Sequence, residues 1–466
     1  MVVILFGGTE QCNNAQWGPT TTRCNEGGTV MMEKSKPKVK KEEYDVVLQG
    51  QPAVKPMVVS QREGEPFRVW SPNEFSLLKR VLIGRPEGTN MPAPEWAWRY
   101  DVPGCKLPSH MPFPQDMVDA ANEQMNYFVE TLEKRGILVD RIPILPMMMN
   151  RPFMSPIGWG QLNMHGVNNV RDVTLVHGHV IVDSPTVRRT RVFERFNLRP
   201  YFNLLAKEDP NCFHTSCPFP MLTDETYDMD YYHDRENRTD EEQREMLLAA
   251  QFQQKNGEFP WESLWDGADI WSLGKDMFYQ RSAVGNKAGE DWLRRFCREH
   301  GFRFHAVTFD TPINSDRPTN FHPWHIDVNM CTPRPGLVIL NPDWPPVDEG
   351  FTQLFKQNDW EVVMGARPTR VHKNDIFLTG LYEGKSWISL NTFSIDENVM
   401  CVEAGETAFM DQLDRLGVEV IPIPYEKVIP FGGALHCTTL DIERDTGDKG
   451  ERGEYEDYFP NQIEGY

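Results

Sequence analysis

The chain has 466 residues, of which 39% are hydrophobic and 25% charged, so it can bury a sizeable core and is too apolar for a disordered protein. Lysine and arginine total 48 against 68 aspartate and glutamate, which gives a net charge of −20. Because such a surface repels phosphate backbones and anionic lipids, we expect no nucleic-acid or membrane partner, whereas a cationic small substrate would be attracted.

The sequence carries no recognisable targeting or membrane segment. Its start, MVVILFGG, lacks the basic region and the apolar length of a secretory signal, and no apolar run approaches the ~20 residues of a spanning helix. Nine cysteines without a CxxC pair fit neither a disulfide framework nor a zinc ribbon. We therefore expect a cytoplasmic protein.

The N-terminal 66 residues differ in composition from the rest. They are rich in Gly, Thr, Gln and Pro and contain a basic stretch from Lys34 to Lys41. We predict a flexible extension over residues 1–66, with a partner-binding tail as the alternative, and one domain over residues 67–466.

Four later segments share one pattern of a helix, a break and a strand. Each has an amphipathic helical stretch, a break at Gly or Asn-Asp and a β-rich stretch, and they cover residues 129–144, 293–309, 354–364 and 410–423. Further strands are predicted at KRVLIGRP, DVTLVHGHVIVDSP, GLVILNPDWP, WISLNTFSI and NVMCVEAG. Repeated ββαβ units and a doubly wound sheet both fit this α/β alternation, and spacing alone does not distinguish them.

Several short motifs contain residue types that catalyse reactions. The stretch from His322 to Asp327 holds two imidazoles, including His325, and a carboxylate, and it fits a catalytic dyad, a structural cluster or, less well, a metal site. The turn FGGALHC brings Cys437 after paired glycines, as for a nucleophile or an ordinary buried cysteine.

Two acidic motifs could serve either a catalytic site or the local structure alone. Asp266 and Asp269 are three residues apart in WDGAD, which suits either a site that orients a base or a helix capping box. Asp172 precedes a predicted strand, where an aspartate often only forms the turn.

Taken together, these segments resemble the amidinotransferases, the family of arginine:glycine amidinotransferase. The similarity covers residues 69–445 in consistent order, and the matching stretches include NNVRDVTLV, HIDVNM, GLVILNPD, SWISLN and FGGALHCTTLD. The resemblance implies a pentein fold, in which five ββαβ modules surround a pseudo-fivefold axis and the site lies at the centre. It also implies a homodimer that needs neither metal nor organic cofactor.

The resemblance also implies roles for individual residues. Cys437 matches the family's nucleophile, His325 its general acid/base, and Asp266 the carboxylate that orients that histidine. Asp172 and Asp327 match the two carboxylates that bind the guanidinium group of the donor. We therefore expect transfer of an amidino group from arginine, with release of ornithine, to an amine through an amidino-cysteine.

Four positions depart from the family pattern. Trp344 stands where the family has the arginine that binds the donor α-carboxylate, Gly384 and Lys385 replace two serines that assist it, and His322 replaces an asparagine near the acceptor. A lysine can supply a point charge to a carboxylate, so we predict that Lys385 takes over part of this function.

Rival functions remain open from the sequence. A guanidine hydrolase of the deiminase type would use water instead of an amine with the same residue types. The His/Asp cluster would also suit a metallohydrolase, and a non-catalytic binding protein could keep the same fold.

Overall fold

The computed structural model describes residues 3–4, 38–93, 95, 97, 110–227, 239, 262–282, 284–309, 325–372, 384–385, 387–447 and 454–463. Within them, one structural unit is repeated: two antiparallel strands, a helix and a third strand that runs parallel to the second. Because each unit exposes one face of its sheet, the helix that follows the second strand covers it and returns the chain.

Four of these units are three-stranded sheets, each with one helix. They comprise β10 (Thr174–His177), β11 (Val180–Asp183), α2 (Glu194–Glu208) and β12 (Phe213–Ser216); β13 (Ile270–Leu273), β14 (Asp276–Gln280), α5 (Lys287–His300) and β15 (Arg303–Val307); β16 (Met330–Arg334), β17 (Leu337–Leu340), α6 (Glu349–Gln357) and β18 (Glu361–Met364); and β21 (Phe393–Asp396), β22 (Val399–Glu403), α7 (Thr407–Arg415) and β23 (Glu419–Ile423).

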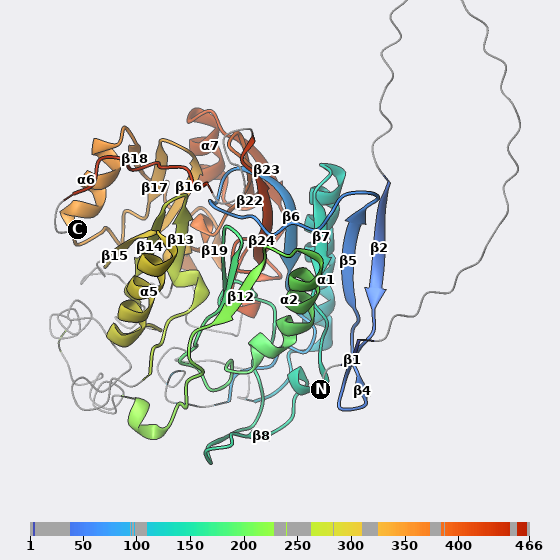
Figure 1. Cartoon of the computed structure of the whole chain (residues 1–466). Coiled ribbons are helices and arrows are strands. Elements are labelled where there is room, and N and C mark those ends of the chain that lie inside the picture. The colour runs from blue at the N-terminus through green and yellow to red at the C-terminus, as the bar shows by residue number, and fades with distance from the viewer. Residues whose placement is uncertain are drawn as a thin grey trace, which may run out of the picture.

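One more unit, the first in chain order, joins the two ends of the folded chain. Strand β24 (Thr439–Asp445) pairs antiparallel with β6 (Leu77–Ile83), and α1 (Gln115–Lys134) leads to β7 (Leu138–Arg141), which lies parallel to β6. Figure 1 shows β24, near the red end of the chain, beside the blue strand β6. The order of this sheet is β2-β5-β7-β6-β24.

The remaining elements are short. They are β1 (Val3–Ile4), β2 (Val39–Tyr44), β3 (Val46–Leu48), β4 (Gln51–Pro52), β5 (Met57–Arg62), β8 (Phe153–Met154), β9 (Gly160–Gln161), β19 (Val371–His372), β20 (Gly384–Lys385) and the 3₁₀ turns η2 (Pro146–Met148), η3 (Asp224–Thr226), η5 (Gly267–Asp269), η6 (Ile326–Val328), η7 (Trp387–Leu390) and η8 (Ile429–Phe431).

The predicted α/β alternation is confirmed in its local detail. The four helix–break–strand segments are α1–β7, α5–β15, α6–β18 and α7–β23. Gly136, Gly301 and Gly417 have φ values of 85°, 78° and 75°, and Asp359 follows α6 with φ 62°. The three glycines end their helices because glycine adopts positive φ without a steric penalty, and aspartate is one of the few other residues that visit this conformation.

Two local expectations were wrong. The segment WISLNTFSI is not one strand, because Trp387–Leu390 forms the turn η7 before β21 begins at Phe393. The structure also shows α2, which the sequence pattern had missed. This helix has Pro200 in its interior, and it buries Glu194, Arg195 and Asn197 beside its apolar side chains, so polar residues interrupt the pattern of an amphipathic helix.

The core extends across unit boundaries. One cluster of buried hydrophobic side chains combines Phe278 of β14, Val338 of β17, Phe355 of α6 and Phe409 of α7. Because neighbouring units share these side chains, no single unit buries its own hydrophobic face completely.

The boundary expected at residue 66 does not coincide with the edge of the sheet. Strand β5 pairs with β7, and Met57 and Val59 are each 1% exposed. The backbone N–H of Ser60 donates to Asp140 Oδ1 at 2.7 Å. Residues 57–62 therefore belong to the folded domain, while residues 5–37 of the predicted extension lie outside the described residues.

We predict that Val59→Ala lowers the free energy of unfolding by about 2 kcal/mol, because it removes buried methyl groups from the packed face of β5. Val39→Ala in the adjacent strand β2 is the matched control, since Val39 is 51% exposed, and it should cost less than about 0.5 kcal/mol. Urea unfolding measures both. Equal, small effects would show that β5 does not contribute to the cooperative core.

Candidate active site

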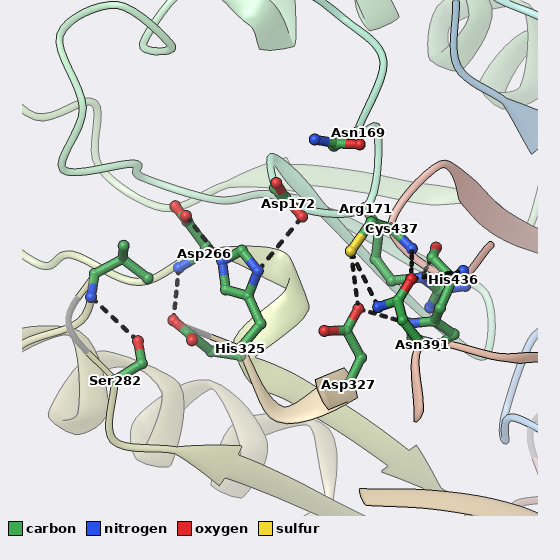
Figure 2. A network of polar contacts seen from close by, with 12 residues as sticks. Asn169, Arg171, Asp172, Asp266, Ser282, His325, Asp327, Asn391, His436 and Cys437 are labelled. Atoms are coloured by element: carbon green, nitrogen blue, oxygen red, sulfur yellow. Dashed lines mark hydrogen bonds and ion pairs between the residues drawn. The ribbon is translucent and has the colours of Figure 1, made fainter. Parts of the chain in front are cut away.

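The residues singled out in the sequence occupy equivalent places in the repeated units. Asp172 lies two residues before β10, Asp266 four before β13, Asp327 three before β16 and Cys437 two before β24. The turns at these places contact one another, η5 with η6 and β10 with η5. Since each side chain enters from the start of a different unit, residues 265 positions apart in the chain meet at one site (Figure 2).

Cys437 is held by the side chain of Asn391. The amide oxygen of Asn391 accepts the backbone N–H groups of His436 (3.0 Å) and Cys437 (3.1 Å), and its Nδ2 donates to the sulfur at 3.1 Å. Asn391 itself lies two residues before β21 and so comes from a further unit. One side chain thus fixes the backbone of residues 432–437, called the nucleophile loop after the role expected of Cys437, and donates a hydrogen bond to the sulfur.

The glycines before Cys437 are required by close packing. Gly432 has φ 98°, and a Cβ atom on Gly433 would lie 2.5 Å from Cys437 Cβ and 2.7 Å from Asn169 Oδ1. Any larger side chain at Gly433 would displace the cysteine or Asn169. Cys437 is 3% exposed, so its thiol is buried.

His325 lies between two carboxylates. Its Nε2 is 3.3 Å from Asp266 Oδ2 and its Nδ1 is 3.7 Å from Asp172 Oδ1. Burial opposes the charged form, but Asp172, Asp266 and Asp269 outweigh it and raise the pKa of His325 to about 9. At neutral pH His325 is therefore an imidazolium and can act as a proton donor.

Asp266 combines both of the interpretations that its sequence motif allowed. Its backbone N–H donates to Asp269 Oδ2 at 3.0 Å, as in a capping box around η5. Its own carboxylate faces His325, and although burial opposes ionisation, the hydrogen bond and charge of His325 lower the pKa of Asp266. The cap orients this carboxylate, which remains ionised beside the histidine.

Asp172 and Asp327 each have one carboxylate oxygen, Oδ2, with a close polar partner and one, Oδ1, that makes no hydrogen bond with the described residues, although Asp172 Oδ1 faces His325 Nδ1 at 3.7 Å. Oδ2 of Asp172 binds Arg191 Nη1 at 2.6 Å, and Oδ2 of Asp327 lies 2.9 Å from His436 Nδ1 and 3.4 Å from Cys437 Sγ. Neither Oδ1 atom accepts a hydrogen bond from the described residues. Two buried acceptors near the thiol are what a planar cation with several N–H donors requires.

The thiol itself is not activated by its surroundings. Burial, Asp327 and Asp172 all raise the pKa of Cys437 well above its usual value, and the hydrogen bond from Asn391 only partly offsets them. The cysteine therefore rests as a thiol. A cation placed between the two carboxylates would reverse this effect, because it neutralises the charges that disfavour the thiolate.

The structure brings together five of the six residues expected from the sequence: Cys437, His325, Asp266, Asp172 and Asp327 (Figure 2). Lys385 lies in β20, and its side chain falls outside the described residues, as does the whole of His322. Trp344 is 4% exposed and belongs to the same buried cluster as Phe351.

Sequence reasoning missed three residues of the site: Asn391, Arg191 and His436. Asn391 lies in SWISLN and His436 in FGGALHC, both among the stretches that carry the resemblance. Their function depends on contacts with residues 45 to 109 positions away, which no local pattern reveals. Arg191 lies just before α2, the helix that the sequence pattern also missed.

The described residues form neither a cluster of metal ligands nor a membrane-spanning helix. No group of three or more His, Cys, Asp or Glu side chains there is arranged to hold a metal ion. None of the helices formed by these residues has the length and apolar character needed to cross a membrane.

No family model matches the chain. It is 30% identical over 404 residues to the mitochondrial glycine amidinotransferase of Xenopus laevis, a match that covers 84% of this chain and 85% of the relative. It is 28% identical over 405 residues to the L-arginine:L-lysine amidinotransferase of Pseudomonas savastanoi pv. phaseolicola, covering 84% and 96%.

Solved structures agree with these relatives. SxtG, an amidinotransferase of the saxitoxin pathway of Microseira wollei, is 26% identical with a TM-score of 0.65, covering 82% of this chain and 99% of that one. Inosamine-phosphate amidinotransferase from Streptomyces griseus has the same TM-score at 21% identity, which shows a shared fold. With this similarity along most of its length, the chain belongs to the amidinotransferase family and is a transferase of amidino groups.

Proposed function

We propose that this amidinotransferase takes its amidino group from arginine, releases ornithine and passes the group to an amine through a covalent intermediate on Cys437. The observation that carries the proposal is the pair of Oδ1 atoms on Asp172 and Asp327 that accept no hydrogen bond from the described residues next to a buried thiol. The names of the relatives support the substrate class, since one acts on L-arginine and L-lysine.

Binding of the donor comes first. A guanidinium is a resonance-stabilised cation and a poor electrophile, so its plane must be fixed against the nucleophile. Asp172 and Asp327 would accept its N–H groups in charge-assisted hydrogen bonds. The bound positive charge offsets both carboxylates, and the thiol of Cys437 then loses its proton to the solvent.

Chemistry follows in two halves. The thiolate attacks the central carbon, and His325, which is protonated at neutral pH, gives its proton to the departing amine of ornithine. The bond from carbon to that amine breaks and an S-amidino cation remains on Cys437. The neutral His325 then accepts a proton from the incoming amine, whose nitrogen displaces the sulfur.

Asp266 acts through His325. It holds the ring at Nε2, which leaves Nδ1 on the side of Asp172 (Figure 2). The guanidinium of the donor would bind on that side. Its charge also stabilises the imidazolium that must exist before the amine departs. No step requires a metal ion or an organic cofactor.

Recognition of the donor's α-carboxylate is assigned to Lys385. The position of the family's arginine is taken by Trp344, which is 4% exposed within a hydrophobic cluster and offers no charge. A buried carboxylate without a partner would be costly, so a cation must replace the missing arginine. Lys385 supplies it as a point charge.

Three broader expectations belong to the same proposal. The five units, of which the first is completed by β24, support a five-module propeller around the site. A homodimer and a cytoplasmic location remain predictions, and the Xenopus relative is named as mitochondrial.

The main competing function is that of a guanidine hydrolase, in which water resolves the amidino-cysteine. The membership of the amidinotransferase family favours an amine as the acceptor.

We predict that the wild-type protein forms ornithine and a new guanidino product from arginine and one member of a panel of amines, and that Cys437→Ala lowers this activity by at least ~1,000-fold. Cys401→Ala is the control, because Cys401 is equally buried but lies in β22, away from the site. Mass spectrometry should find an amidino adduct on Cys437. Product release from arginine without any amine would identify a hydrolase instead.

We predict that Asp266→Asn moves the basic limb of the pH profile of ornithine release to lower pH. Activity requires protonated His325, whose pKa is about 9, and removal of the Asp266 charge lowers that pKa. The rate should also fall by roughly 100-fold or more, since the ring loses its orientation. Asp276→Asn, a buried carboxylate that contacts His305, controls for general destabilisation. An unchanged basic limb would contradict a function of Asp266 through His325.

We predict that wild type prefers arginine to agmatine, which lacks the α-carboxylate, by roughly 10-fold or more in kcat/KM, and that Lys385→Ala abolishes this preference. Lys427→Ala, an exposed lysine paired with Glu426, should leave the preference unchanged. Equal use of both donors by the wild type would exclude recognition of the carboxylate by Lys385.

A further inference from the structure

His436, the residue before the nucleophile, has both ring nitrogens on carboxylates. Nδ1 is 2.9 Å from Asp327 Oδ2 and Nε2 is 3.3 Å from Glu74 Oε2, while the ring is 3% exposed and stacks on Trp271 at 4.9 Å. An ionised carboxylate offers only acceptors, so both nitrogens must carry a proton. The geometry thus requires a buried imidazolium.

The charged groups around His436 form one continuous network of ion pairs and hydrogen bonds. Arg171 reaches Glu74 at 3.5 Å and Asp441 at 3.0 Å, and its Nε donates to the carbonyl of His436 at 3.0 Å and of Thr439 at 3.1 Å. Through Arg171, this network is hydrogen-bonded to the backbone on both sides of Cys437. It therefore positions the nucleophile loop together with Asp327.

Two of the carboxylates in this network, those of Glu74 and Asp327, stay ionised. Burial opposes ionisation of Glu74, yet Arg171 and His436 lower its pKa to about 2. Burial likewise opposes ionisation of Asp327, and the hydrogen bond and charge of His436 lower its pKa, with smaller effects from His325 and Arg171. The ionised state of Asp327 consequently depends on the proton that His436 keeps.

The contact with His436 also decides which oxygen of Asp327 remains for a ligand. Oδ2 is occupied by Nδ1 and lies 3.4 Å from Cys437 Sγ, whereas Oδ1 accepts no hydrogen bond from the described residues. In Figure 2, Asp327 lies between His436 and His325, with its carboxylate toward the sulfur. A freely rotating carboxylate would offer no such fixed acceptor.

We propose that His436 is a positioning residue, an imidazolium that holds Asp327 ionised and directs its Oδ1 to the guanidinium of the donor. The assignment rests on the proposed function, because it gives the substrate-binding role of Asp327 a structural cause. His436 does not exchange protons with the substrate; that function belongs to His325.

His436→Gln and His436→Asn separate the hydrogen bond from the charge. The amide nitrogen of asparagine can take the place of Nδ1 and keep the bond to Asp327, whereas glutamine reaches toward Nε2 and loses it. We expect KM for arginine to rise by roughly 10- to 100-fold in His436→Gln with a smaller fall in kcat, and His436→Asn to recover most of this loss.

The pH profile tests the charge. Both variants lack the cation, so the pKa of Asp327 rises and the acid limb of kcat/KM for arginine moves to higher pH. The groups facing Asp327 are His436, Cys437, His325 and Arg171, and Glu74 and Arg171 face His436. The variants change only His436, and all the other groups are the same as in the wild type.

His305→Asn is the matched control. His305 is also buried, lies 2.7 Å from Asp276 and stacks on Phe278 at 4.9 Å, but it belongs to β15. It should lower thermal stability by an amount similar to the His436 variants and leave KM and the acid limb unchanged. If His436→Gln does not fold, the acid limb of kcat/KM for arginine in His436→Asn tests the proposal by itself.

The proposal would be overturned if the acid limb of kcat/KM for arginine in His436→Asn matched that of the wild type. It would also be overturned if the His436 and His305 variants changed KM for arginine equally. Calorimetric binding of arginine to Cys437→Ala, with and without His436→Gln, separates this outcome from failure of the proposed function. Absence of amidino transfer by the wild type would refute the function, whereas unaltered arginine binding in the double variant would refute the positioning role.

Discussion

The site is organised by the need to keep carboxylates ionised inside the protein. Asp172 and Asp327 lie buried near the same thiol, where unpaired negative charge is strongly disfavoured. Each carboxylate is therefore paired through one oxygen with a fixed cation, Arg191 at 2.6 Å and His436 at 2.9 Å. The second oxygen of each stays available, so the same pairing that makes burial tolerable also leaves two acceptors aimed at a ligand.

This arrangement links reactivity to the substrate. The carboxylates that would bind a guanidinium raise the pKa of Cys437, so the enzyme without a donor holds an unreactive thiol. A cationic donor bound between them would remove that obstacle, and an anionic or neutral molecule would not. The net charge of −20 acts in the same direction, because it attracts cations from solution.

Repetition of one structural unit explains how distant residues converge. Asp172, Asp266, Asp327, Asn391 and Cys437 all stand two to four residues before the first strand of a unit. Because the units repeat the same connectivity, equivalent positions lie at equivalent places in the fold, and the contacts among η5, η6 and η7 bring these starts together. The final strand, β24, completes the first unit and carries the cysteine into the group.

The sequence by itself determined what local interactions decide. Helices that end at Gly136, Gly301 and Gly417 were predictable, because a stripe of apolar residues and a residue with positive φ act within one segment. The resemblance supplied Cys437, His325 and their three carboxylates. Tertiary structure alone decided the place of β5 in the sheet, the burial of the thiol and the protonation of His436, since these depend on pairing and charges contributed by segments far apart in the chain.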